Sequence, residues 1–179
     1  KVSKMDKDHL KNIHARLYEE APEQTILLPA SDKEPQGWMI SEIPLPESDE
    51  NHDTLLDITL LQTPPDFEAL RWIQASGPFG NTDMPKPGMY WNGESQLIIQ
   101  KSIQLDEIPE KASIRIYYTR VGGPRVTMMH SRIYLNGEFV ADETTRQINQ
   151  EKRMSEVILP DEAMNALTQG ENTLIIQFV

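Results

Sequence analysis

Two aromatic residues, Tyr90 and Trp91, closely follow the Gly- and Pro-rich run Asn81–Gly88, which is unsuited to a regular strand. An exposed aromatic ring on a loop offers a flat apolar surface that suits stacking against a sugar ring. Arg125, His130 or Arg132 would supply hydrogen bonds to the sugar hydroxyl groups. Tyr90, Trp91, Arg125 and His130 are therefore the candidate residues of a carbohydrate-binding surface. The alternative, which we favour for the two aromatic residues, is that Trp91 is a core residue beneath the loop and that Tyr90 is only amphipathic.

A second loop, between Arg120 and Arg125, places two arginines around Gly122 and Gly123. The glycines allow a close approach of the backbone. An arginine fork can bind a carboxylate or sulfate of an acidic sugar through two parallel hydrogen bonds. A β-turn between two strands explains the same residues, and we favour that interpretation.

The sequence lacks the usual signatures of catalysis. Without cysteine there is no thiolate nucleophile or thiolate metal site, and there is no Gly-x-Ser-x-Gly motif. His9 and His14 are five residues apart, so they do not share a helix face as a zinc-binding pair would. We therefore expect the chain not to be an enzyme. A hydrolase with an unrecognised carboxylate pair is the competing hypothesis, with Asp106, Glu107 and Asp142 as candidates.

The acidic run Asp49–Asp53 has oxygen ligands at the first, third and fifth positions of a calcium loop. The glycine expected next is replaced by Thr54, and the twelfth position is Leu60 instead of Glu, which excludes an EF-hand. We expect no cofactor. An irregular structural calcium site stays open as an alternative to a solvated acidic loop.

These candidate residues must be positioned by strands. Apolar residues recur at helical spacing only in Asp6–Glu20, a predicted helix that Pro22 ends. Beyond it, short β-rich runs alternate with turn residues, which is typical of an all-β sandwich or barrel. The predicted strands are Thr25–Leu28, Trp38–Ile43, Thr54–Leu61, Leu70–Ala75, Gln96–Leu105, Ser113–Arg120, Arg132–Leu135, Glu138–Ala141, Ser155–Leu159 and Thr173–Val179.

Two local patterns add detail. Asn136 and Gly137 suit the two positive φ angles of a type I′ hairpin turn. A short helix or turn is predicted at Asp161–Leu167, with Gly170 as its C-cap. We divide the chain into an N-terminal helical segment or linker, 1–24, and one β domain, 25–179.

The composition restricts the function classes. The 179 residues include 28 acidic and 17 basic ones, for a formal net charge of −11. Duplex binding needs clustered cations that release counterions from phosphates, so we expect no nucleic-acid partner. No run of 18 apolar residues occurs in the sequence, so we expect no membrane span.

Four segments together, in order, resemble the galactose-binding-like β-sandwich, a jelly roll found as an accessory domain of glycoside hydrolases. The similarity covers about Trp38 to Val179. The motifs are Trp72 with Gly77-Pro78-Phe79-Gly80, Trp91 with Leu97–Ile103, the hairpin Ile133–Val140, and Gly170-Glu171-Asn172 with the apolar run that follows it.

The resemblance implies a mainly β fold, an antiparallel jelly-roll sandwich, carrying a short N-terminal helix outside the common core. It also implies a non-catalytic, carbohydrate-associated module of an exported polysaccharide-processing enzyme, located in the periplasm, at the cell surface or outside the cell. The expected partners are a glycan and a catalytic domain of the same polypeptide. A structural spacer or protein-docking domain that binds no sugar is the alternative.

Overall fold

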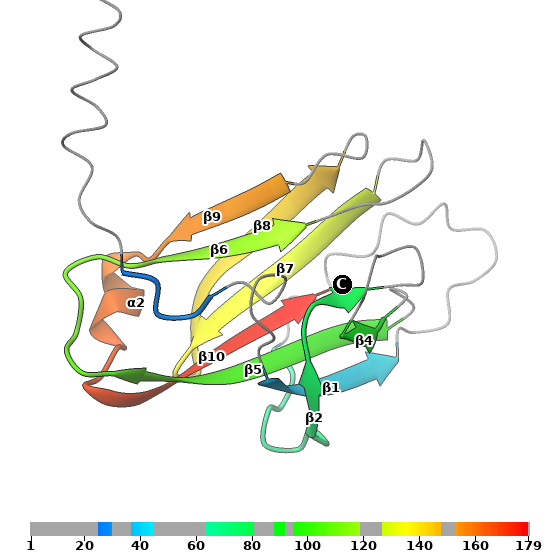
Figure 1. Ribbon diagram of the computed structural model, residues 1–179, viewed down its shortest axis with the longest axis horizontal. Coiled ribbons are helices and arrows are strands. Elements are labelled where there is room, and N and C mark those ends of the chain that lie inside the picture. The colour runs from blue at the N-terminus through cyan, green and yellow to red at the C-terminus, as the bar shows by residue number, and fades with distance from the viewer. Residues whose placement is uncertain are drawn as a thin grey trace, which may run out of the picture.

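The computed structural model describes residues 25–29, 37–44, 64–80, 88–91, 95–118, 127–147 and 153–178. This part of the chain is mainly β and contains one short helix (Figure 1). The predicted helix Asp6–Glu20 and strand Thr54–Leu61 lie outside the described residues. The elements are β1 (Gly37–Pro44), β2 (Ile73–Ser76), β3 (Phe79–Gly80), β4 (Met89–Tyr90), β5 (Ser95–Leu105), β6 (Ser113–Tyr118), β7 (Thr127–Leu135), β8 (Glu138–Gln147), β9 (Arg153–Ile158), α2 (Asp161–Asn165) and β10 (Gly170–Phe178).

Six strands form one antiparallel sheet in the order β2-β1-β5-β10-β7-β8. The C-terminal strand β10 pairs with β5 on one side and with β7 on the other, so it lies in the middle of the sheet. An antiparallel β6–β9 ribbon forms a second layer over one face of this sheet, and α2 stands at one end of the two layers (Figure 1). A two-residue parallel pairing joins β3 to β4.

The main core lies between the six-stranded sheet and the β6–β9 ribbon. Alternate residues of each central strand point into it, as the period of two in a pleated strand requires. Its buried members are Trp38, Ile40, Leu97, Ile99, Leu105, Ile116, Ile133, Leu135, Val140, Val157, Leu159, Ala163, Leu167, Leu174, Ile176 and Phe178.

The opposite face of the sheet, here called the outer face, is also covered at its centre. Ile98, Tyr134 and Ile175 form a second buried cluster there. The segment 64–72 packs on this cluster through Phe67 and Trp72, and the Trp72 indole Nε1 donates a hydrogen bond to the Phe67 carbonyl oxygen at 3.1 Å.

Three of the predicted local structures differ from the structure in whole or in part. Thr25–Leu28 forms no strand, because Ile26 and Leu27 are exposed and only Leu28 packs against the core. The predicted strand Leu70–Ala75 begins only at Ile73, since the chain turns just before it. In that turn the Asp66 carboxylate accepts hydrogen bonds from two backbone N–H groups, those of residues 68 and 69.

The third error concerns the end of the helix. The helix α2 is present, but its C-cap is Ala166 in a right-handed conformation. Gly170 instead begins β10 with a φ of 102°, a value that glycine adopts without strain. Gly170 therefore provides the positive φ angle at the start of β10 and does not cap the helix.

The hairpin turn lies where the sequence predicts it. Asn136 and Gly137 connect β7 to β8 with φ angles of 52° and 86°. Both angles are positive, as a type I′ turn requires. This turn sets the pairing of β7 with β8, which carries the site described below.

Candidate functional site

Tyr90 and Trp91 have different surroundings. Tyr90 ends β4 with 54% of its surface exposed. Trp91 is half-buried and packs against the main core, with its ring centre 6.3 Å from that of Phe178. Its indole Nε1 donates a hydrogen bond to the Ser95 carbonyl oxygen at 3.1 Å. Tyr90 is therefore the ring of the two that presents an open face.

The structure does not bring the four predicted carbohydrate-binding residues to one surface. Trp91 contacts Phe178, which pairs with Ser131 on the core side of the sheet. His130 is the neighbour of Ser131 along β7, so it faces the outer side, where it is buried. Trp91 and His130 thus lie on opposite faces of the sheet, and Arg125 is outside the described residues.

A different group of side chains meets on the outer face of the β7–β8 pair. Arg132 pairs with Asp142 across the two strands, and Tyr134 pairs with Phe139. Arg132 Nε lies 2.7 Å from Asp142 Oδ1, and Nη2 lies 3.3 Å from Oδ2, so the ion pair has two hydrogen bonds. The Arg132 guanidinium carbon is 5.0 Å from the centre of the Phe139 ring. We call Arg132, Phe139 and Asp142 the sheet-face site.

This site combines an open ring with a fixed polar pair. Phe139 is 51% exposed, although it is a large apolar residue. The Arg132 side chain is only 14% exposed, and that of Asp142 is 55% exposed. A guanidinium at this distance from a ring is held by cation–π attraction as well as by its carboxylate partner. The polar groups are therefore held in place beside the exposed ring.

Tyr134 forms the buried floor of the site. Its ring makes edge-to-face contacts with Phe67 and Phe139, at centroid distances of 5.0 and 6.1 Å. Burial raises the pKa of the Tyr134 hydroxyl, and the Arg132 charge offsets part of this effect. Arg132 lies close enough to the Tyr134 hydroxyl to lower its pKa, but it is turned toward Asp142 and makes no hydrogen bond of acceptable geometry with the hydroxyl. The hydroxyl has no other hydrogen-bond partner among the described residues.

Sequence reasoning named Arg132 as a hydrogen-bonding residue and Asp142 as an acidic candidate, but it missed Phe139 and their juxtaposition. The reason is a β-bulge. Ile133 pairs with Ala141 and Tyr134 pairs with Phe139, so Val140 is the extra residue of β8. Strict alternation would place Phe139 and Asp142 on opposite faces, because they are three residues apart. The bulge brings them to the same face.

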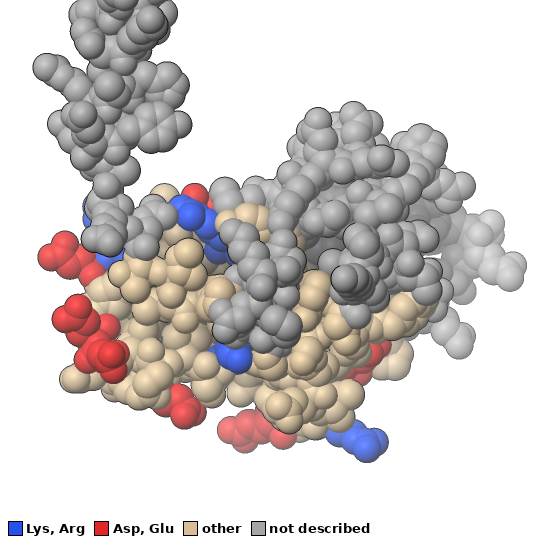
Figure 2. Space-filling view, in the orientation of Figure 1, with Lys and Arg blue, Asp and Glu red and all other residues tan. Residues whose placement is uncertain are grey.

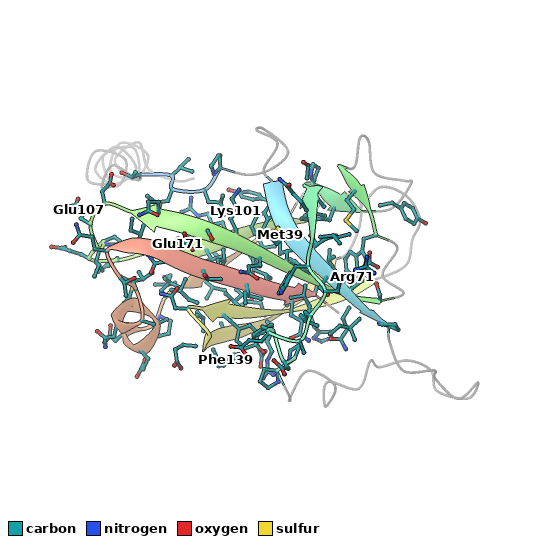
Figure 3. The ribbon with its side chains drawn as sticks, turned by 90° about the horizontal axis from the view of Figure 1, so that it is seen from below. Met39, Arg71, Lys101, Glu107, Phe139 and Glu171 are labelled. Atoms are coloured by element: carbon teal, nitrogen blue, oxygen red, sulfur yellow. The ribbon has the colours of Figure 1, made fainter. Side chains whose placement is uncertain are left out.

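The candidate hydrolytic carboxylates do not form a pair with Asp142. Gln177 of β10 pairs with Ile98 of β5 on one side and with Arg132 of β7 on the other, and Arg132 pairs with Asp142 of β8. Asp142 therefore lies at the level of Ile98 across the sheet. From Ile98 to Asp106 the extended chain advances on the order of 25 Å, at about 3.3 Å per residue. Glycosidase carboxylates are about 5 to 9.5 Å apart. In Figure 3, Glu107 lies at the left end of the sheet, and Phe139 lies near the lower edge, well separated from it.

Neither a metal centre nor a membrane-spanning helix is found in the described ranges. Within them, no group of three or more His, Asp or Glu side chains is arranged to hold a metal ion. The acidic run Asp49–Asp53 lies outside those ranges. In the described part of the chain, no helix has the length and apolar character needed to cross a membrane.

Comparisons with protein-family models, with curated proteins and with solved structures each gave no match to this chain.

Proposed function

We propose that this chain is a non-catalytic, carbohydrate-binding accessory domain of an exported polysaccharide-processing enzyme, built as a galactose-binding-like jelly-roll sandwich. Export and the catalytic partner follow from the resemblance alone. Support for the finer fold comes from two of the motifs that carry the resemblance. Asn136 of the hairpin and Asn172 of the closing strand are hydrogen-bonded to one another at 2.8 Å. Motifs that are distant in the sequence therefore belong to one structural unit.

The observation that carries the binding proposal is the sheet-face site. Ligand sites typically combine apolar or aromatic surface with a few well-placed polar groups. Phe139 offers the ring on which a pyranose can stack, and Arg132 with Asp142 offers donors and acceptors for its hydroxyl groups. Because the ion pair and the cation–π contact already order these side chains, little conformational entropy is lost on binding.

A similar trio on the β6–β9 ribbon is a weaker candidate. Tyr117 is 46% exposed, and Arg115 pairs with Glu156 on the same face of the ribbon. That ion pair has a single Arg115 contact, Nε to Oε1 at 2.9 Å, and both side chains are about one-third exposed. This ion pair therefore lacks the second hydrogen bond that joins Arg132 to Asp142, and its side chains serve as matched controls.

Titration calorimetry with a panel of neutral oligosaccharides tests the proposal. One stacked ring with several hydrogen bonds predicts a Kd between about 1 mM and 1 μM, since ordering and desolvation oppose the contacts. We expect Phe139→Ala to weaken binding at least tenfold, roughly the effect of losing one buried aromatic contact. Tyr117→Ala should leave the Kd unchanged. Loss of binding in Tyr90→Ala instead would move the site to the β4 loop, and no binding of any oligosaccharide would refute the proposal.

A structural spacer remains the second candidate, because Trp91 packs against the core and the β6–β9 ribbon exposes apolar side chains. Ile158 is 73% exposed on the outer side of that ribbon, close to the Ser113 end of β6. A spacer would use such a surface to contact its catalytic domain. Hydrogen exchange of the full polypeptide would then show protection of β6 and β9 relative to the isolated chain, and no oligosaccharide would bind.

A further inference from the structure

We infer that the sheet-face site selects uncharged glycans and excludes those that carry carboxylate or sulfate groups. This inference rests on the proposed carbohydrate binding and specifies its substrate class. It also differs from the acidic-sugar hypothesis that the arginines of the Arg120–Arg125 loop suggest in the sequence.

The first reason is that the charge of Arg132 is already neutralised. Arg132 Nε and Nη2 both bond to the carboxylate of Asp142, at 2.7 and 3.3 Å. Two-point pairing is the geometry by which arginine binds a carboxylate or sulfate. Asp142 occupies the Nε–Nη2 edge and balances the charge of Arg132, so an incoming anion would meet the remaining N–H donors without an unpaired positive charge.

The second reason is the hydrogen-bonding capacity that is left. A guanidinium has five N–H donors, and a carboxylate accepts about four hydrogen bonds. The two bonds between Arg132 and Asp142 leave donors and acceptors side by side at the edge of the Phe139 ring. A sugar hydroxyl both donates and accepts, so adjacent hydroxyl groups match this pair without any net charge.

The third reason is electrostatic repulsion. More than half of the Asp142 side chain is exposed, so a ligand anion beside Phe139 would face an open carboxylate. The chain has a formal net charge of −11, and Figure 2 shows acidic side chains at the end that carries α2 and along the lower edge. Two isolated unit charges 4 Å apart in water repel by an energy that weakens binding roughly fivefold, and the Arg132 charge beside Asp142 offsets part of this repulsion. Neutral glycans escape this penalty.

The test compares oligosaccharides that differ only in charge. Calorimetric titrations at low and high NaCl use two pairs of oligomers, each pair of equal length. The first pair is a galactose and a galacturonic acid oligomer, and the second is a glucose and a glucuronic acid oligomer. We expect a neutral oligomer to bind more tightly than its uronic counterpart, by up to about fivefold. We also expect the Kd of the neutral oligomer to be the same at both salt concentrations, because no net charge is brought together.

Asp142→Asn gives the decisive variant, because it frees the positive charge of Arg132 and keeps the size of the side chain. The preference for the neutral oligomer should shrink about fivefold. Added salt should weaken uronic binding to this variant, whereas it should strengthen uronic binding to the unmodified chain by screening the repulsion. Glu156→Gln makes the same change in the ion pair of the β6–β9 ribbon. It should alter neither the ratio of the neutral and uronic affinities nor the salt dependence of uronic binding.

The outcomes separate the two proposals. If no oligomer of either class binds, the proposed carbohydrate binding is refuted, and this inference with it. If uronic oligomers bind the unmodified chain more tightly than neutral ones, carbohydrate binding stands and the inference of neutral selectivity is wrong. Neutral selectivity by this ion pair is also refuted if Asp142→Asn folds normally by thermal melting but leaves the ratio of the two affinities unchanged.

Discussion

Asn136 and Asn172 are joined by a hydrogen bond from Nδ2 of the first to Oδ1 of the second, at 2.8 Å. Asn172 is buried and also donates to the carbonyl oxygens of Thr168 and Gly170. Asn136 Oδ1 in turn accepts from the backbone N–H of Thr173 at 2.7 Å. The two amides thereby tie the β7–β8 hairpin turn to the beginning of the central strand β10.

Replacement of this buried amide should destabilise the fold. We expect Asn172→Ala to lower the free energy of unfolding by about 2–4 kcal/mol, because several buried partners lose their hydrogen bonds together. Urea denaturation followed by circular dichroism measures the change. Asn165→Ala, at an exposed helix position, is the control and should change stability by less than about 0.5 kcal/mol. Equal effects of the two substitutions would contradict the role given to Asn172.

Removal of the buried hydroxyl of Tyr134 should have the opposite effect. This hydroxyl has no partner among the described residues, which is unfavourable compared with its hydration in the unfolded chain. Tyr134→Phe keeps the ring and its edge contacts, so we expect a gain of about 1 kcal/mol in the free energy of unfolding. A loss of stability in the same urea experiment would show that the hydroxyl has a partner in solution.

The raised pKa of Tyr134 predicts a dependence on alkaline pH. Burial raises the pKa above its ordinary value of 10.0. The unfolded chain therefore loses this proton at a lower pH than the folded chain does. The contribution of this pKa difference to the free energy of unfolding is complete below about pH 10 and is lost as the pH rises through the folded-state pKa. Unfolding midpoints measured from pH 8 to pH 11 should fall less steeply for Tyr134→Phe than for the unmodified chain. Parallel curves would contradict the prediction.

Gly88 occupies a position that no side chain can enter. A Cβ built there would lie 2.3 Å from the Ser76 carbonyl oxygen and 2.7 Å from that of Gly77. Both contacts are with backbone, so the chain itself would have to shift. We expect Gly88→Ala to cost at least about 2 kcal/mol in thermal or urea unfolding. Gly37→Ala meets only the Gln74 side chain, at 3.7 Å, and a similar loss in that control would point to a general effect of glycine replacement.

The sequence determined those features that depend on local conformation. Asn136 and Gly137 adopt positive φ with little strain, so their hairpin was predictable from two residues. The strand predicted at Ser113–Arg120 contains β6, Ser113–Tyr118, and the short helix near Asp161 was predicted within two residues of its end. The turn, the strand and the short helix each depend on interactions between residues close together in the chain, so the sequence alone is enough to predict them.

Only the tertiary structure decided which residues share a surface. Val140 bulges out of register because the hairpin pairs Tyr134 with Phe139, and this shift places Phe139 beside Arg132 and Asp142. The pairing of β10 with β7 puts Trp91 and His130 on opposite faces, although the sequence suggested one common site. Strand register and strand order depend on contacts between residues far apart in the chain, which periodicity within a single strand does not encode.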